Sequence, residues 1–164
     1  MKRLLSFLLV SALCVVCTVP SFAVNTVPQQ KNETVISVSE ENLGNGFTMI
    51  TVTSFLKSNI GLLANVSSQS KTYRRTGVVE HNGSRIGSIT LTASFGYDGS
   101  SAWVNSMRTS HSVASGWSYE NESTWKSGGT ANMSASMIKR LAFITIAEAD
   151  PSLSMTCSLS GQIS

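Results

Sequence analysis

Residues 89–104, ITLTASFGYDGSSAWV, predict the fold class of this chain. Apolar and small polar residues alternate strictly from Ile89 to Tyr97, which is the pattern of a β-strand that buries one face. Asp98-Gly99 follows at once, and this dipeptide favours the tight turn of a β-hairpin. The stretch therefore predicts a strand, a turn and a returning antiparallel strand.

Candidate strands of the same character occur along the whole chain. They cover residues 33–39, 47–55, 73–80, 85–97, 102–113, 116–126, 131–139, 141–146 and 153–159. Turn residues separate them, and Asn82-Gly83 is the dipeptide best suited to a type I′ hairpin turn. Eight or nine short strands without a credible long helix predict an all-β fold. We expect a single antiparallel β-sandwich over residues 33–164, with a small β-barrel as the alternative.

Two segments fit more than one element. Residues 57–70 suit a short helix about as well as an interrupted strand, and the sequence leaves both open. Residues 130–146 have apolar residues at helical spacing and also a strict alternation. The polar residues Asn132 and Ser134 are poor choices for a helix surface, so we predict a strand over 131–139.

Two irregularities accompany the predicted strands. Between Ile86 and Ile89 the apolar phase slips by one residue, which predicts a β-bulge at Gly87. Residues 141–146 are apolar on both faces of the strand. This run predicts a strand that is covered on both sides, or one at a sheet edge under a loop.

The first 23 residues have the organisation of a secretory signal peptide. Lys2 and Arg3 precede an apolar run over residues 4–19, and Ser21-Phe22-Ala23 has the form of a cleavage site. The run is shorter than the roughly 20 residues of a membrane-spanning helix, and no later run approaches that length. We expect residues 1–23 to be removed and residues 24–32 to form a flexible arm. The protein is then secreted, without a transmembrane segment in the mature chain.

Removal of the signal peptide would leave Cys157 as the last of the three cysteines. A disulfide within one chain is then impossible, so packing has to stabilise the exported protein. Cys157 lies in the alternating segment 153–159, where a cysteine acts as a small buried hydrophobic residue. We therefore expect Cys157 in the core.

The charge of the chain argues against one class of partner. The formal net charge is +3, and it falls to +1 when Lys2 and Arg3 are removed with the signal peptide. A charge this small provides no basic field for nucleic acid. The abundance of Ser, Thr, Gly and Asn suits the polar outer faces of strands.

No set of residues in the sequence predicts a reaction. The two histidines, His81 and His111, have no ligand-type neighbour at metal-site spacing, so we expect no metal and no cofactor. His81 borders a hairpin turn and is interpreted as a solvated turn residue. His111 and Ser112 are adjacent in a strand, so their side chains face opposite ways and cannot act as a base and its nucleophile. We expect a protein that is not an enzyme.

Glu120 and Glu122 are the one carboxylate pair with a catalytic spacing. On a regular strand they share a face about 7 Å apart, which fits an inverting glycosidase. Thr124 and Lys126 continue the same polar pattern and favour the solvated face of an outer strand instead.

The aromatic residues of the same strand would lie opposite these glutamates. Trp117 and Tyr119 are interpreted as packed against the core. Trp125 lies near the turn Ser127-Gly128-Gly129, and the sequence favours core packing and ligand contact about equally for it. As a ligand contact, its flat ring would stack on the face of a sugar.

The direction of Trp103 depends on the length of the preceding turn. With a two-residue turn at Asp98-Gly99, Phe95 pairs with Ala102 and Trp103 points outward beside Ser94. A three-residue loop pairs Phe95 with Trp103 and buries the indole. The first pairing keeps the apolar residues together, so we prefer it and predict a Trp103 that points outward. Such a Trp103 is the best single candidate for a ligand contact.

Four segments of the chain resemble one group of exported proteins. The runs TLTASFGYDG, HSVASGW, SGGTA and LSMTCSLSGQIS, within residues 73–164, are similar to small uncharacterised exported proteins of Gram-positive, clostridial-type bacteria. The resemblance lies in turns and strand alternation, and it implies secretion and an all-β fold. Those proteins have no assigned activity, so it implies nothing about function.

The leading hypothesis is a secreted, non-enzymatic binding or interaction domain. Its partner would be a cell-wall or host glycan, or another protein, bound through aromatic and hydroxyl-rich strand surfaces. The alternative is a bacteriocin-like or pore-forming β protein in which strands such as 130–137 unfold into a membrane hairpin. Strands alternate in the same way in both, so the sequence does not separate these two hypotheses.

Overall fold

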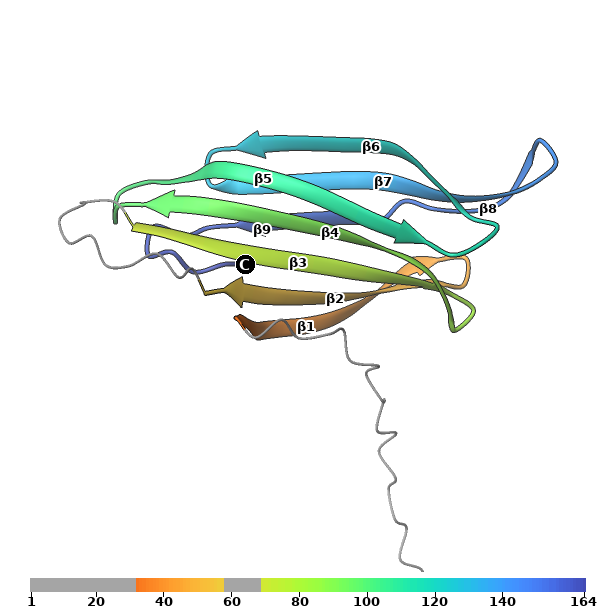
Figure 1. Cartoon of the computed structure of the whole chain (residues 1–164), viewed down its shortest axis with the longest axis horizontal. Helices are drawn as coiled ribbons and strands as arrows, with labels where there is room; N and C mark the ends of the chain where they lie inside the picture. The colour runs from red at the N-terminus through yellow and green to blue at the C-terminus, as the bar shows by residue number, and fades with distance from the viewer. Residues whose placement is uncertain (1–31, 58–68) are drawn as a thin grey trace, which may run out of the picture.

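A computed structural model describes residues 32–57 and 69–164. The predicted signal peptide, residues 24–31 of the predicted arm and residues 58–68 of the ambiguous segment lie outside the described residues. The described residues form nine antiparallel strands in two sheets (Figure 1).

The larger sheet, sheet A, is an antiparallel meander in which each strand pairs with the next along the chain. Its strands are β1 (Glu33–Gly44), β2 (Phe47–Leu56), β3 (Gln69–His81), β4 (Ser84–Tyr97) and β5 (Ala102–Val113). The turns Asn45-Gly46 and Asn82-Gly83 have positive φ at both residues, as type I′ hairpin turns require. The Asn-Gly signal in the sequence is thus confirmed.

The smaller sheet, sheet B, is built around its central strand β7. Its strands are β6 (Ser118–Ser127), β7 (Thr130–Leu141), β8 (Ile144–Ala149) and β9 (Ser152–Thr156). β6 pairs with one edge of β7, while β8 and β9 follow one another along the other edge. Their register is continuous except for a shift between Lys139 and Arg140, near the β7–β8 turn. Pro151 separates β8 from β9 because it has no N–H for the ladder, although its carbonyl still accepts a bond from Ala135 N.

The two sheets pack face to face as a β-sandwich, as the sequence predicts. Their inner faces share one hydrophobic core, to which both sheets contribute. Its fully inaccessible members include Val79, Ile89, Leu91, Phe95, Met133, Met137 and Met155. Within the described residues the strand pairing leaves both sheets open, so the barrel alternative is wrong. Cys157 is 4% exposed, which confirms its predicted place in the core.

The bulge predicted in β4 is displaced by one residue. Val79 pairs with Gly87 and Glu80 pairs with Arg85, which leaves Ile86 as the extra residue. A Cβ on Gly87 would lie 2.5 Å from Ser112 O on β5 and 3.0 Å from Met137 Sδ on the opposite sheet, so the glycine allows both to approach. The phase slip in the sequence thus located the irregularity but not the residue that absorbs it.

The turn between β4 and β5 is longer than the sequence predicts. Tyr97 pairs with Ala102, so the loop comprises the four residues 98–101, and Phe95 pairs with Val104. The predicted pairing of Phe95 with Ala102 is wrong. Asp98 Oδ1 accepts bonds from Ser100 N at 2.9 Å and Ser101 N at 2.7 Å, and these bonds stabilise the longer loop.

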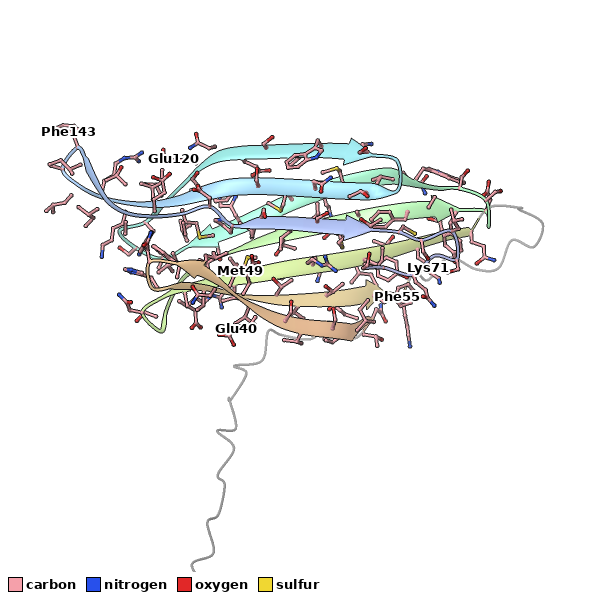
Figure 2. The ribbon with its side chains drawn as sticks, turned by 180° about the vertical axis from the view of Figure 1, so that it is seen from behind. Glu40, Met49, Phe55, Lys71, Glu120 and Phe143 are labelled. Carbon is pink, nitrogen blue, oxygen red and sulfur yellow. The ribbon has the colours of Figure 1, made fainter. Side chains whose placement is uncertain are left out.

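Residues 130–146 form β7, a turn and the start of β8, so the strand prediction over 131–139 is confirmed. The prediction that residues 141–146 are covered is wrong. Leu141 and Ile144 are each 69% exposed, and Phe143, in the turn between them, is 99% exposed. The hairpin projects beyond the neighbouring turns (Figures 1 and 2) because β7 and β8 extend past the end of sheet A.

Candidate functional site

The outer face of β3, β4 and β5 carries a regular array of hydroxyl side chains. The alternate residues of these strands, such as Ile89 and Leu91, are buried in the core, so their neighbours point outward. The outward residues form four cross-strand rows of three, and nine of these twelve residues are Ser or Thr. The rows are Thr72, Ser94 and Ser106; Arg74, Thr92 and Arg108; Thr76, Thr90 and Ser110; and Val78, Ser88 and Ser112. We name this surface the hydroxyl face.

Hydrogen bonds between hydroxyl groups connect the strands across this face. Thr76 Oγ1 and Thr90 Oγ1 are 3.1 Å apart, and Ser88 Oγ and Ser112 Oγ are 2.8 Å apart. A hydroxyl has one donor and two acceptor sites, so each pair retains further sites that point to solvent. Neighbouring strands lie about 4.8 Å apart and rows about 7 Å apart, so these sites have a fixed spacing.

Two arginines share one row of the hydroxyl face. Arg74 Nη1 lies 2.9 Å from Glu33 Oε2 on β1, and Arg108 is exposed on the edge strand β5. Thr92, which lies between them, is only 7% exposed. The planar guanidinium groups add fixed donors that suit hydroxyl, carboxylate or phosphate oxygens.

Trp103 lies at the end of the hydroxyl face next to the 98–101 loop. It pairs with Gly96, and a Cβ on that glycine would be 2.6 Å from Trp103 Nε1 and Cζ2, so the ring lies directly on the backbone of β4. The backbone covers one side of the indole and leaves the side chain half-buried. Trp103 therefore points outward as predicted. It lies beside Gly96 rather than Ser94, because the loop is two residues longer than the predicted turn.

A β-bulge in β5 orients this indole. Phe95 pairs with Val104 and Ser94 with Ser106, which leaves Asn105 as the extra residue. Trp103 Nε1 donates to Asn105 Oδ1 at 2.8 Å, and Asn105 Nδ2 donates to Ser70 Oγ at 3.4 Å. Ser70 Oγ is in turn 3.2 Å from Ser94 Oγ, so the indole is connected to the hydroxyl face. The sequence contains no signal for this bulge.

Trp125 lies on the outer face of the other sheet. It pairs with Asn132 of β7 and is 48% exposed. Sheet A carries Trp103 and sheet B carries Trp125 on surfaces that face away from each other, so the two residues do not form one binding surface. Trp125 also has hydroxyl side chains beside it, in the rows Ser123–Ser134–Ser152 and Ser127–Thr130–Thr156. Trp103 differs from it because its indole lies on Gly96 and donates to Asn105, which fixes the ring.

The prediction that Trp125 lies opposite both glutamates is wrong, because β6 contains a bulge. Asn121 adopts a positive φ of 55°, and the pairing skips from Glu120 to Ser123. The bulge reverses the alternation within β6. Trp125 therefore shares the outer face with Glu120, whereas Tyr119 and Glu122 turn toward β5.

Glu120 and Glu122 consequently do not form the predicted pair on one face. Glu120 forms an ion pair with Arg140, and this contact holds the pKa of its carboxyl below the ordinary value. Glu122 accepts hydrogen bonds from Thr109 Oγ1 at 2.5 Å and Tyr119 Oη at 2.8 Å, which lower its pKa as well. Both directions are opposite to the raised pKa that is typical of the general acid of a glycosidase.

His111 and Tyr119 connect the edges of the two sheets. Their rings are stacked, with centroids 3.6 Å apart and an interplanar angle of 11°. Burial, followed by the hydrogen bond to Glu122, raises the pKa of Tyr119, so its phenol remains a donor to that carboxylate. Ser112 bonds to Ser88 on the opposite side of β5, so His111 and Ser112 do not pair, as the sequence predicts.

His81 is not the solvated turn residue that the sequence predicts. Its ring stacks on Phe47 with centroids 4.3 Å apart and meets Trp117 at 5.8 Å in an edge-on arrangement. Trp117 also meets Phe47 edge-on at 5.9 Å. The three rings close one end of the sandwich, so Trp117 packs against the core as predicted.

An open hollow lies at the other end of the sandwich, beside the C-terminal segment. It measures about 580 Å³, and its walls include Ile36, Phe55, Lys71, Tyr73 and Ile163. Tyr73 Oη donates to Gly161 O at 2.8 Å and Lys71 Nζ to the same oxygen at 3.3 Å, so these polar groups already have partners in the protein. The hollow is thus a weaker candidate than the hydroxyl face.

Residues 32–57 and 69–164 contain no group of three or more His, Cys, Asp or Glu residues placed to bind a metal ion. Within the same ranges, no helix has the length and hydropathy that crossing a membrane requires. Comparisons with family models, with curated proteins and with solved structures found no match. The resemblance to exported clostridial-type proteins therefore stays a prediction.

Proposed function

We propose that this protein is a secreted, non-enzymatic domain that binds a glycan of a cell wall or host surface through Trp103 and the hydroxyl face. The observation that carries the proposal is the fixed indole. Its inner side lies on Gly96, its N–H is bonded to Asn105, and the half-buried side chain stands at the end of the outer face of sheet A. A preorganised aromatic ring lowers the entropy lost on binding.

The hydroxyl face supplies the second half of the recognition chemistry. Sugars present hydroxyl groups that both donate and accept hydrogen bonds, and the Ser and Thr side chains beside Trp103 do the same. Arg108 is exposed on this face and would add charge-assisted bonds to acidic or hydroxyl groups of the glycan. A flat surface of this kind suits a linear polymer more than a small molecule, which requires a concave pocket.

Secretion is part of the proposal and rests on the sequence of residues 1–23. The basic start, the apolar run and the small-x-small site together form a signal peptide pattern. Expression in a bacterial host with N-terminal sequencing of the protein recovered from the medium tests this part. A start at Val24 supports it, whereas retention in the cell with residues 1–23 intact contradicts it.

The pore-forming hypothesis is the weaker one because of the position of β7. This strand pairs with β6 on one side and with β8 and β9 on the other, and its Met133 and Met137 are completely buried. Extracting β7 to form a membrane hairpin would expose the core of the sandwich, which is thermodynamically expensive. Glycan binding requires no such rearrangement.

A cell-wall pulldown and a glycan array test the proposal. The chain without residues 1–23 is compared with Trp103→Ala, which removes the indole but leaves the hydroxyl pairs in place. We expect Trp103→Ala to reduce retention about tenfold or more, since a buried aromatic contact contributes about 1.5–3 kcal/mol. Trp103→Phe should restore part of the retention because it retains a ring.

Trp125→Ala is the matched control, since it removes the same side chain from the outer face of the other sheet. It should leave retention unchanged. Equal retention of wild type and Trp103→Ala would overturn the proposed site. If a wall protein retains the domain and no glycan fraction does, the partner is a protein instead of a glycan. The glycan should be recovered uncleaved, because the proposal assigns no catalytic group.

A further inference from the structure

We propose that the apolar end of the β7–β8 hairpin is a membrane anchor that inserts into the interface of a lipid bilayer. The apolar tip comprises Leu141, Ala142, Phe143, Ile144 and Ile146. Phe143 is 99% exposed, Leu141 and Ile144 are 69% exposed, and Ile146 is 53% exposed. Soluble proteins rarely expose a contiguous apolar group of this kind without a function for it.

The shape of the apolar tip favours a bilayer over another protein surface. Figure 2 shows Phe143 at the extreme end of the molecule, well beyond the body of the sandwich. Protein interfaces of ordinary size need broad complementary surfaces, and a narrow convex hairpin end offers little area for one. A bilayer interface accepts such a projection because lipid molecules rearrange around it.

The polarity changes along the hairpin axis in the order that a bilayer interface requires. The apolar tip ends at Leu141, and Arg140 and Lys139 follow on β7. Arg140 and Lys139 lie two and three residues behind the turn residue Ala142, roughly 7–10 Å at about 3.3 Å per residue, which is the depth of interfacial insertion. Lysine and arginine at this depth place their charged ends among the headgroups while their alkyl parts remain in the apolar layer.

Trp117 lies at the same level as these cations. Lys139 Nζ is 5.9 Å from the centre of the Trp117 ring. Trp is enriched at membrane interfaces because its ring combines an apolar body with a hydrogen-bond donor. The apolar tip thus has a belt of Trp and basic residues behind it.

The charges of this belt are nearly balanced, which determines the kind of membrane. Arg140 forms an ion pair with Glu120. Glu148 lies on β8 next to Ala147, which pairs with Lys139. With two cations and two carboxylates, the belt has no strong attraction for anionic lipids. The apolar tip therefore binds by burial of apolar surface, and neutral and anionic bilayers should bind it similarly.

Sedimentation with vesicles tests this proposal. The chain without residues 1–23 is used, because the apolar run of the predicted signal peptide would itself bind lipid. This truncation removes none of the nine strands. Vesicles of phosphatidylcholine, with and without phosphatidylglycerol, are compared. We expect wild type to bind both, and Phe143→Ser to lower the partition coefficient about tenfold, the effect of exposing rather than burying one large apolar side chain.

Leu159→Ser is the matched control, since Leu159 is 50% exposed and lies in the turn beside the C-terminus, at the other end of the sandwich. It should not change the partition coefficient. Phe143→Trp provides a second measurement, in which brominated lipid should quench the added indole. Failure of wild type to sediment with either vesicle, or identical sedimentation of Phe143→Ser, would overturn the proposal.

Dye-filled vesicles separate anchoring from pore formation. The proposed anchor leaves the vesicles intact at protein concentrations that saturate binding. Release of dye would mean deeper insertion and would overturn an interfacial anchor. Retention on glycans is independent of these results, because Trp103 and the apolar tip lie at opposite ends of the strands.

Discussion

Trp103 lies flat on Gly96, its cross-strand partner, and the glycine is the reason that the indole occupies this position. Any side chain on Gly96 would overlap the ring, since a Cβ there would be 2.6 Å from Trp103 Nε1. The indole N–H in turn bonds to Asn105, the extra residue of the bulge in β5. A missing side chain on one strand and an extra residue on the other together fix the orientation of the proposed ligand platform.

Gly96→Ala should displace the indole and weaken glycan retention about as much as Trp103→Ala. We expect a loss of about 1–3 kcal/mol in the free energy of unfolding, because the added methyl group overpacks the site. Urea unfolding followed by tryptophan fluorescence measures this loss. In a Trp103→Ala background the same substitution should cost much less, because the clash is gone. An equal cost in both backgrounds would contradict the geometry.

Tyr73→Phe should loosen the C-terminal turn from sheet A. Tyr73 Oη donates to Gly161 O at 2.8 Å in a buried position, and removal of this donor should lower stability by about 1–2 kcal/mol. Tyr97→Phe is the control, because Tyr97 Oη donates to the exposed residue Gln69 and water replaces that bond more easily. Thermal unfolding and limited proteolysis measure the difference. A larger effect of Tyr97→Phe would disprove this role of Tyr73.

Glu122→Gln should reduce the pH dependence of stability in acid. The folded pKa of Glu122 is lowered by hydrogen bonds from Thr109 and Tyr119. Its contribution is therefore complete above the unfolded pKa of about 4.3 and is lost as the pH falls through the folded pKa. The carboxyl is largely exposed, so the effect at neutral pH should stay below about 1 kcal/mol.

Chemical denaturation of wild type and Glu122→Gln between neutral pH and about pH 2–3 checks this prediction. The difference in unfolding free energy between the two proteins should be largest at neutral pH and shrink in acid. A difference that grows as the pH falls would have the wrong sign for a lowered pKa.

Ala142→Gly should stabilise the β7–β8 hairpin. Ala142 has a φ of 54°, a left-handed conformation that strains a residue with a Cβ by about 1–2 kcal/mol. Glycine relieves the strain but makes the unfolded chain more flexible, so we expect a net gain of no more than about 1 kcal/mol. Thermal unfolding measures it, and a clear loss of stability would show that the turn does not have this conformation. Vesicle binding should persist, because the large apolar side chains of the tip, Leu141, Phe143, Ile144 and Ile146, are unchanged.

The sequence was informative where local chemistry decides the structure. Strict alternation predicted β4 and β7, and Asn-Gly predicted the β3–β4 turn. The phase slip near Gly87 predicted a bulge within one residue of its position. These features depend on side-chain periodicity and on φ preferences of a few neighbouring residues, so they are legible without the rest of the fold.

The candidate site was only half predictable. The outward direction of Trp103 was predicted, but the turn length used to predict it was wrong, and the two-residue difference preserved the direction only because strand periodicity is two. In β6 the bulge at Asn121 changed the phase by one residue, so the predicted faces of Trp125 and Glu122 were wrong. Asn adopts positive φ readily, but one Asn in a polar strand is no specific signal for a bulge.

By itself, the sequence determined that this protein is an all-β chain with alternating strands, tight glycine turns and a cysteine in its core. Only the tertiary structure decided that three strands align nine hydroxyl side chains on one face, that Trp103 lies on Gly96, and that the apolar tip projects into solvent. The physical reason is that periodicity states which residues share a side of one strand. Which strands then lie together, and where they end relative to the opposite sheet, is set by register and bulges between segments distant in sequence.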